Sequence, residues 1–235
     1  MIEQYAINID DTTCFEQLSV FDGCISAERK KSIGKFHFEK DKMRSMLAEV
    51  LLRYLLEKKY GFSQSDVVFG YEKYGKPYLL CNKENIYFNI SHSGSWVICG
   101  IGTSAIGIDV EEMKKQEVSI AKRVLSQKEY ELWAQLPAER KRERFYNLWV
   151  LKESYSKYIG RGIGIPFETL TFHIDKDDAV LEMEGKTDDS CCFLLNALDD
   201  GHCVALCADR KERQDILQEI QIIKLGELLE WRLGS

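Results

Sequence analysis

Two carboxylates stand at alternate positions of an otherwise apolar segment, the stretch IGIDVEE at residues 106–112. Side chains alternate across a β-strand with a period of two, so Asp109 and Glu111 lie on one face and Ile108 and Val110 on the other. Two like charges on one face of a strand need a cation or a basic partner nearby. The segment therefore predicts a strand that holds a positively charged ligand or side chain.

A third carboxylate lies in WVLKESYSKYIGRG, where Trp149, Glu153 and Lys157 recur at every fourth position and so share one face of a helix. If that face meets the strand, Asp109 and Glu111 converge with Glu153, and Lys157 lies one turn away. Three oxygen ligands, without histidine or cysteine at metal spacing, describe a site for Mg²⁺ or Mn²⁺. Because Mg²⁺ commonly holds substrate phosphates, the predicted ligand is a phosphorylated small molecule.

Two further stretches could bind a phosphate. The segment NISHSGSW, residues 89–96, offers hydroxyls, backbone amides and an imidazole in a short span. Residues 29–44 hold seven Lys or Arg against Glu39 and Asp41, a local polyanion site in a chain of formal net charge −6. The competing interpretation of such a run is a solvated helix face. The overall negative charge argues against general binding of nucleic acid.

The predicted helices and strands that position these residues occur in the same order in two parts of the chain. Residues 40–61 have the spacing of a helix, and after them come two short strands, DVVFGYE and KPYLL, and a hairpin of IYFNIS and WVICGIG. About a hundred residues later, a helix in ERFYNLWVLKESYSKYIGRG precedes the strands TLTFHID and AVLEME and a hairpin of CCFLLNAL and CVALCAD. The pattern predicts an α+β fold of two pseudo-symmetric halves, residues 1–105 and 106–235, with the active site at the seam.

Composition sets the broad class. The chain has 235 residues, 45% of them hydrophobic and 30% charged, which is ordinary for a globular protein with a core. It begins without the pattern of a signal peptide and has no apolar run as long as a membrane span, so we expect a cytoplasmic protein. The eight cysteines show no disulfide framework.

Other catalytic motifs are weak. The chain has no G-x-x-x-x-G-K-[ST] sequence, and the glycines of GRGIG follow a helix, so neither a P-loop nor a dinucleotide fold is indicated. No G-x-S-x-G surrounds the serines near His92, which argues against a hydrolase triad.

The stretches FNISHSGSWVICGI, IGIDVEE and LWVLKESYSKYIGRG, in this order and spacing, closely resemble the Sfp-type 4'-phosphopantetheinyl transferases. KYGKP at residues 73–77 matches a further element of that family, and the resemblance runs from about residue 25 to 165. It implies transfer of the 4'-phosphopantetheine arm of coenzyme A to a serine of an acyl or peptidyl carrier protein, with release of 3',5'-ADP. It also implies a monomer in which the two halves form one site.

The resemblance assigns roles to individual residues. Asp109, Glu111 and Glu153 would bind Mg²⁺, with Mn²⁺ as an alternative. Lys157 would contact the pyrophosphate, and Glu153 would take the serine proton directly or through a metal-bound water. The coenzyme A contacts implied by the resemblance are Arg29, Arg44, Gly75, Lys76, Ser91, His92 and Lys157.

By the same resemblance the first half recognises the adenine and 3'-phosphate, and the second half provides the metal site and the carrier-docking segment. That segment, MKKQEVSIAKRV, has cations suited to an acidic carrier helix: Lys114, Lys115, Lys122 and Arg123. The chain departs from the family at Ser32, where many relatives have a lysine. We expect either that Lys31 or Lys35 replaces this charge or that the protein discriminates less between coenzyme A and its dephospho form.

Two rival functions remain open on the sequence. One is a non-catalytic module that binds coenzyme A or a carrier protein, although Asp109, Glu111, Glu153 and Lys157 are all present. The other is a different Mg²⁺-dependent phosphotransferase that acts on a nucleotide, against which the SHSG and KYGKP elements argue.

Overall fold

The computed structural model describes residues 1–12, 14–81, 85–114, 118–161, 164–176, 178–199 and 201–234. Its first half contains β1 (Ile2–Asn8), α1 (Ala27–Ile33), α2 (Glu39–Tyr60), β2 (Phe69–Tyr71), β3 (Pro77–Leu79), β4 (Tyr87–Ser93) and β5 (Trp96–Gly102). The second half contains β6 (Ile106–Glu112), α3 (Val118–Val124), α4 (Gln127–Gln135), α5 (Ala138–Ile159), β7 (Leu170–Asp175), β8 (Asp178–Met183), β9 (Lys186–Asp188), β10 (Cys191–Asp199) and β11 (His202–Asp209). The chain ends with β12 (Ile216–Ile222) and α6 (Leu225–Leu233).

The two predicted halves have the same strand order. In the first, β4 and β5 form a hairpin and β5 pairs with β1, giving the order β12-β1-β5-β4. In the second, β10 and β11 form a hairpin and β11 pairs with β6, giving β10-β11-β6. The pairings of β1 with β5 and of β6 with β11 are both antiparallel. The repeat is not complete, because β12 adds to the first sheet in parallel with β1, and the small sheet β2-β3 corresponds to the three strands β7-β8-β9. The α+β fold and its repeated order are as the sequence predicts.

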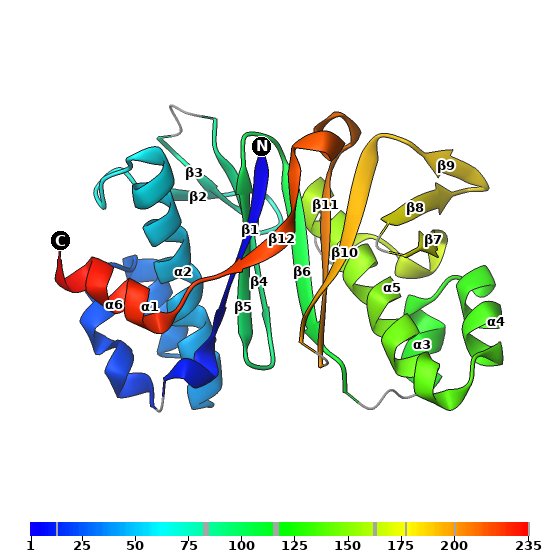
Figure 1. Ribbon diagram of the computed structural model, residues 1–235, viewed down its shortest axis with the longest axis horizontal. Coiled ribbons are helices and arrows are strands. Elements are labelled where there is room, and N and C mark those ends of the chain that lie inside the picture. Colours follow the sequence, from blue (N-terminus) through cyan, green and yellow to red (C-terminus); the bar gives the residue numbers. More distant parts are fainter. Residues whose placement is uncertain are drawn as a thin grey trace.

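The two sheets lie between two groups of helices, so the molecule has four layers (Figure 1). An apolar cluster fills the space between the sheets, with contributions such as Ile98 of β5, Ile108 of β6 and Leu206 of β11. Helices α1, α2 and α6 lie on the outer side of the first sheet, and α3, α4 and α5 lie on the outer side of the second.

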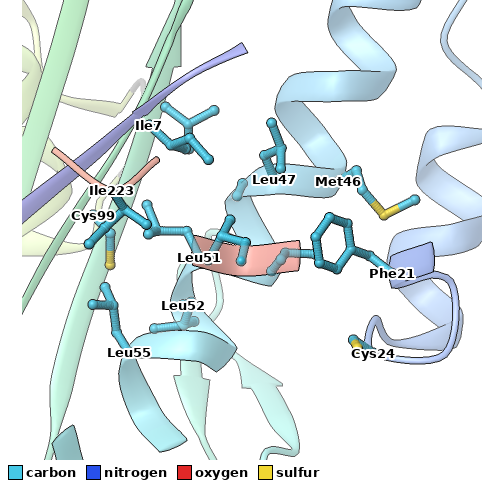
Figure 2. Close-up of a cluster of buried hydrophobic side chains, with 14 of the residues drawn as sticks. Ile7, Phe21, Cys24, Met46, Leu47, Leu51, Leu52, Leu55, Cys99 and Ile223 are labelled. Carbon is cyan, nitrogen blue, oxygen red and sulfur yellow. The ribbon is translucent and has the colours of Figure 1, made fainter. Parts of the chain in front are cut away.

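Each long helix packs on its sheet through residues at helical spacing. Figure 2 shows Leu47, Leu51 and Leu55 of α2 in one cluster with Ile7 of β1 and Cys99 of β5. The three leucines recur every fourth position and so form one apolar stripe. α5 covers β6, β10 and β11 in the same way, and this packing brings the residues of α5 next to the carboxylates of β6.

Candidate active site

A glycine on β6 lets α5 approach the strand closely. A Cβ atom at Gly107 would lie only 1.9 Å from the carbonyl oxygen of Ser154 and 2.4 Å from the amide nitrogen of Tyr158. No other residue fits at this contact without moving the helix backbone. Since residues 107, 109 and 111 share a face of β6, the carboxylates of Asp109 and Glu111 are directed toward the same helix.

Lys157 of α5 and Ser91 of β4 both bind Asp109. The Lys157 ammonium donates to Asp109 Oδ1 at 2.6 Å and to Ser91 Oγ at 2.8 Å. The Ser91 hydroxyl in turn donates to Asp109 Oδ1 at 2.8 Å. Asp109 is buried, and among the described residues its second oxygen, Oδ2, has no hydrogen-bond partner. An unpaired buried carboxylate oxygen is costly, so Oδ2 is a position where a cationic ligand would be favourable.

The other two predicted ligands lie close enough to repel Asp109. Burial raises the pKa of Glu111 to about 7, and the charge of Asp109 adds to the shift, although a hydrogen bond from Ser93 at 2.8 Å opposes it. Burial and the charge of Asp109 also raise the pKa of Glu153, while Lys157 opposes the increase. The three carboxylates therefore lie near enough to interact where β6 meets α5, and a divalent cation would relieve their repulsion.

The donor set fits a hard cation, because it consists of carboxylate oxygens and includes the unpaired Oδ2 of Asp109. In the described part of the chain, no three His, Cys, Asp or Glu side chains are already arranged as a metal site. Asp109 instead has the ammonium of Lys157 as its nearest positive charge.

Alternate side chains of β4 connect the two halves. Asn89 accepts a hydrogen bond from the amide of Ile108 at 2.8 Å, and Ser93 accepts one from the amide of Glu112 at 3.1 Å. With Ser91 between them, these side chains link β4 to β6 along the seam. Ser91 is one of the site residues expected from the sequence. Asn89 and Ser93 are not, although the polar alternation in NISHS indicates that they share a face of the strand with Ser91.

His92 points to the other side of β4, where Arg44 of α2 lies. Arg44 donates to the carbonyl of Gly94 in the hairpin turn and forms an ion pair with Asp41. Desolvation lowers the pKa of His92, and the positive charge of Arg44 is the next cause, with smaller effects from Lys157 and Arg29. Arg44, with smaller contributions from Lys157 and Arg29, thus gives His92 a positive environment, which an anionic phosphate would complement.

A cavity of about 580 Å³ opens beside these residues. Its walls come from both halves: Phe38, Glu39, Lys40, Asp41, Arg44, His92, Ser93, Gly94, Ser95, Glu112 and Lys114. Arg29 lies nearby on α1 and donates to Glu49 at 3.3 Å and Ser45 at 3.2 Å. Lys31 and Lys35, the residues predicted to replace a basic group at Ser32, are both exposed.

The turn that contains Gly75 and Lys76 lies at the far end of the seam. Gly75 has a positive φ of 87°, the left-handed conformation that favours glycine. The Lys76 ammonium does not point into the cavity. It donates to the carbonyl oxygens of Lys157 at 2.7 Å and Ile106 at 3.1 Å.

The predicted carrier-docking segment is described in part. Lys114 is exposed and pairs with Glu112 at 3.0 Å, and Lys122 and Arg123 lie in the last turn of α3. The Lys122 ammonium lies over the ring of Tyr130, 5.8 Å from its centre. Lys115 falls outside the described residues.

Comparison with known proteins gives matches along most of the chain. Residues 105–207 match the family model of the 4'-phosphopantetheinyl transferase superfamily, and residues 12–103 match that of the N-terminal part of 4'-phosphopantetheinyl transferase. The 4'-phosphopantetheinyl transferase Sfp of Bacillus subtilis (strain 168) is 32% identical over 226 residues, which cover 96% of this chain and 99% of that protein. A second 4'-phosphopantetheinyl transferase of Bacillus subtilis is 35% identical over 207 residues, 87% of this chain and 90% of that protein.

Among solved structures, a holo-(acyl-carrier-protein) synthase from Bacillus anthracis str. Ames in complex with CoA (3',5'-ADP) is similar to part of the chain. The sequence identity is 25% and the TM-score is 0.39, with 45% of this chain and 95% of that chain covered.

Proposed function

The chain belongs to the 4'-phosphopantetheinyl transferase superfamily, and on that premise we propose a magnesium-dependent transfer of 4'-phosphopantetheine from coenzyme A to a serine of an apo carrier protein. The carrier is an acyl or peptidyl carrier protein, and the products are the holo carrier and 3',5'-ADP. The observation that carries the proposal is the ion pair of Lys157 with Asp109. The charge of Asp109 also helps to raise the pKa values of Glu111 and Glu153, so the three carboxylates interact where β6 meets α5.

The reaction exchanges the phosphoanhydride bond of coenzyme A for a phosphoester bond to serine. The serine oxygen attacks the phosphorus that carries the pantetheine arm, a new P–O bond forms, and the bond from this phosphorus to the oxygen of 3',5'-ADP breaks. The serine proton passes to Glu153, whose pKa is raised mainly by burial and then by Asp109, which brings its basicity closer to neutral pH. Lys157 lies where it can stabilise negative charge on the leaving phosphate oxygen.

Asp109, Glu111 and Glu153 are the residues that would hold Mg²⁺. When bound, the ion would neutralise the charge that develops on the pyrophosphate during phosphoryl transfer. Ser91 and Ser93 support this role, because their hydroxyls donate to Asp109 and Glu111 and so fix the carboxylates in place.

Each half has its own part in substrate binding. We assign the adenine and 3'-phosphate of coenzyme A to residues 1–105, through Arg29, Arg44, His92 and the turn with Gly75. We assign the metal and the carrier to residues 106–235, with Lys114, Lys122 and Arg123 facing the acidic carrier helix.

Two further properties belong to the proposal. All eight cysteines are free thiols, which suits the reducing cytoplasm, and among the described helices none has the length and apolar character needed to span a bilayer. Because both halves contribute residues to one site, a monomer is sufficient for activity, and light scattering on the eluting protein would test that state.

The intact mass of a purified apo carrier domain tests the function. After incubation with this protein, coenzyme A and Mg²⁺, the carrier should gain about 340 Da, the mass of one phosphopantetheine group, and the gain should be absent with EDTA. Binding of coenzyme A without any gain on several unrelated carriers would instead identify a binding module. Binding of ATP in preference to coenzyme A would identify a different phosphotransferase.

A further inference from the structure

The Lys76 side chain is fully engaged by backbone oxygen atoms of the second half. Its ammonium donates to the carbonyls of Ile106, Lys157 and Tyr158, at 3.1, 2.7 and 3.4 Å. An ammonium has three protons to donate, so these acceptors satisfy it. Lys76 therefore has no proton left for a coenzyme A phosphate unless one of these contacts breaks.

The acceptors belong to the two elements that carry the site. Ile106 is the first residue of β6, the strand that bears Asp109, and Lys157 and Tyr158 lie in the last turn of α5. The carbonyls at a helix C-terminus have no partner within the helix and carry partial negative charge, so a cation there is favourable. Burial lowers the pKa of the Lys76 ammonium, and the charge of Glu72 opposes that effect.

A second observation shows that the turn around Lys76 packs against this helix end. Gly160 ends α5 with a φ of 74°, and a Cβ atom there would lie 2.7 Å from Glu72 Oε2 and 3.7 Å from Lys76 Cδ. The turn itself is closed by hydrogen bonds between Glu72 and both Lys76 and Gly75 at 2.9 Å. The close fit and the three carbonyl contacts fix the turn on α5.

From these contacts we infer that Lys76 is a positioning residue, which ties the turn at residues 72–76 to the end of α5 and so sets the place of Lys157. The same residue, Lys157, is held from both sides: Lys76 binds its carbonyl, and Asp109 and Ser91 bind its ammonium. The inference rests on the proposed function, because the reaction needs the Lys157 ammonium at the pyrophosphate. It differs from the expectation that the Lys76 ammonium contacts coenzyme A.

The test compares Lys76→Met with Lys76→Arg and with Lys58→Met, a control whose exposed side chain lies in the last turn of α2. A displacement of the catalytic group by about 1 Å costs about 100-fold. Lys76→Met should therefore lower kcat by roughly 10- to 100-fold while the Kd for coenzyme A, measured by calorimetry, changes by less than about threefold. Lys76→Arg should recover part of kcat, because a guanidinium also donates to several carbonyls, and Lys58→Met should behave as the wild type.

A loss of coenzyme A affinity with kcat unchanged in Lys76→Met would overturn the inference and assign the ammonium to the ligand. Unchanged kcat and Kd would also overturn it. If Lys76→Met does not fold, Gly160→Ala provides a second test, because it moves the turn without removing the cation. This variant should also lose more in kcat than in affinity for coenzyme A. An inactive wild-type protein, by contrast, would refute the proposed function itself.

Discussion

The two halves of the molecule build the same contact between a strand and a helix from different residues. β1 and β6 each have seven residues and pair in the same register with β5 and β11. Counted from the strand start, Tyr5 takes the place of Asp109 and Ile7 takes the place of Glu111. Both residues are buried in the apolar core beneath α2.

The long helices correspond in the same way, since α2 and α5 both have 22 residues and both end at a glycine in the left-handed conformation. The counterpart of Glu153 is Tyr54, which packs edge-on against Trp231, and the counterpart of Lys157 is the exposed Lys58. The first half has one carboxylate at this contact, Glu3 of β1, which is buried and pairs with Lys59 of α2 at 2.7 Å. Counted in the same way, Glu3 stands at the place of Gly107, so the places of Asp109, Glu111 and Glu153 hold no carboxylate in the first half. The fold therefore forms this contact without carboxylates at those three places, which supports the proposal that they bind a ligand.

One pair of equivalent residues is alike in both halves. Lys152 of α5 is buried and donates to Glu129 and to the carbonyls of Phe167 and Leu170. Its counterpart Arg53 of α2 is buried and donates to Glu49 and to the carbonyls of Gln64 and Val67. In each half a buried cation fixes the segment that follows the helix, so these two residues belong to the common scaffold.

Substitution of Asp109 should have the largest effect on the rate of transfer. Asp109→Asn removes the charge that binds the cation while it preserves the shape of the side chain, so transfer should fall by about 1000-fold or more. The fold should survive, because the first half has no carboxylate at this place. Initial rates of holo-carrier formation against Mg²⁺ concentration would measure the loss, with Tyr5→Phe as the control at the equivalent position. Near wild-type activity of Asp109→Asn would refute the metal assignment.

The scaffold residues should affect stability in both halves. Lys152→Met leaves the buried Glu129 without its cation, so it should lower the free energy of unfolding by about 3 kcal/mol. Arg53→Met should lower it by less, because Arg29 still donates to Glu49 at 3.3 Å. Urea unfolding followed by circular dichroism would measure both variants. An unchanged stability of either variant would contradict the equivalence of the two cations.

Lys157 should affect catalysis more than binding. Lys157→Ala removes a cation that acts mainly on the leaving phosphate, so transfer should slow by about 100-fold while the Kd for coenzyme A rises by less than about fivefold. The exposed counterpart, Lys58→Ala, should leave both quantities unchanged. Equal losses in affinity and in kcat/KM, with kcat preserved, would show that Lys157 only binds the ligand.

Helices and strands that have a local hydrophobic periodicity can be predicted from the sequence, together with the residues that they carry. The contact of Lys157 with Asp109 depends on how α5 meets β6, which the spacing leaves open. The helices α2 and α5 and the two hairpins follow from periods of 3.6 and 2. The pairing of β12 with β1 does not, because residues 216–222 are largely exposed and their partner lies more than 200 positions away. The contacts of the Lys76 ammonium with carbonyls of β6 and α5 are likewise tertiary, so they cannot be predicted from a lysine in a turn sequence.

The smallest effect concerns Glu111, whose pKa is raised to about 7 in the folded protein. Between its ordinary value of 4.5 and about 7, the folded state holds a proton that the unfolded state has lost, so this residue destabilises the metal-free protein as pH rises through that window. Glu111→Gln should remove this contribution and be more stable than the wild type at pH 8, but not at pH 4, by on the order of 1 kcal/mol, since solvent moderates the repulsion.

Urea unfolding in EDTA at both pH values would measure the Glu111 effect, with Glu112→Gln, the next carboxylate on β6, as the control. Mg²⁺ should reverse the order at pH 8, because the ion binds the ionised carboxylate and stabilises the wild type more than the variant. An equal response of both proteins to pH and to Mg²⁺ would place Glu111 outside the metal site. At the contact between strand and helix, Asp109, Glu153 and Lys157 would then remain as the proposed site residues that distinguish the second half from the first.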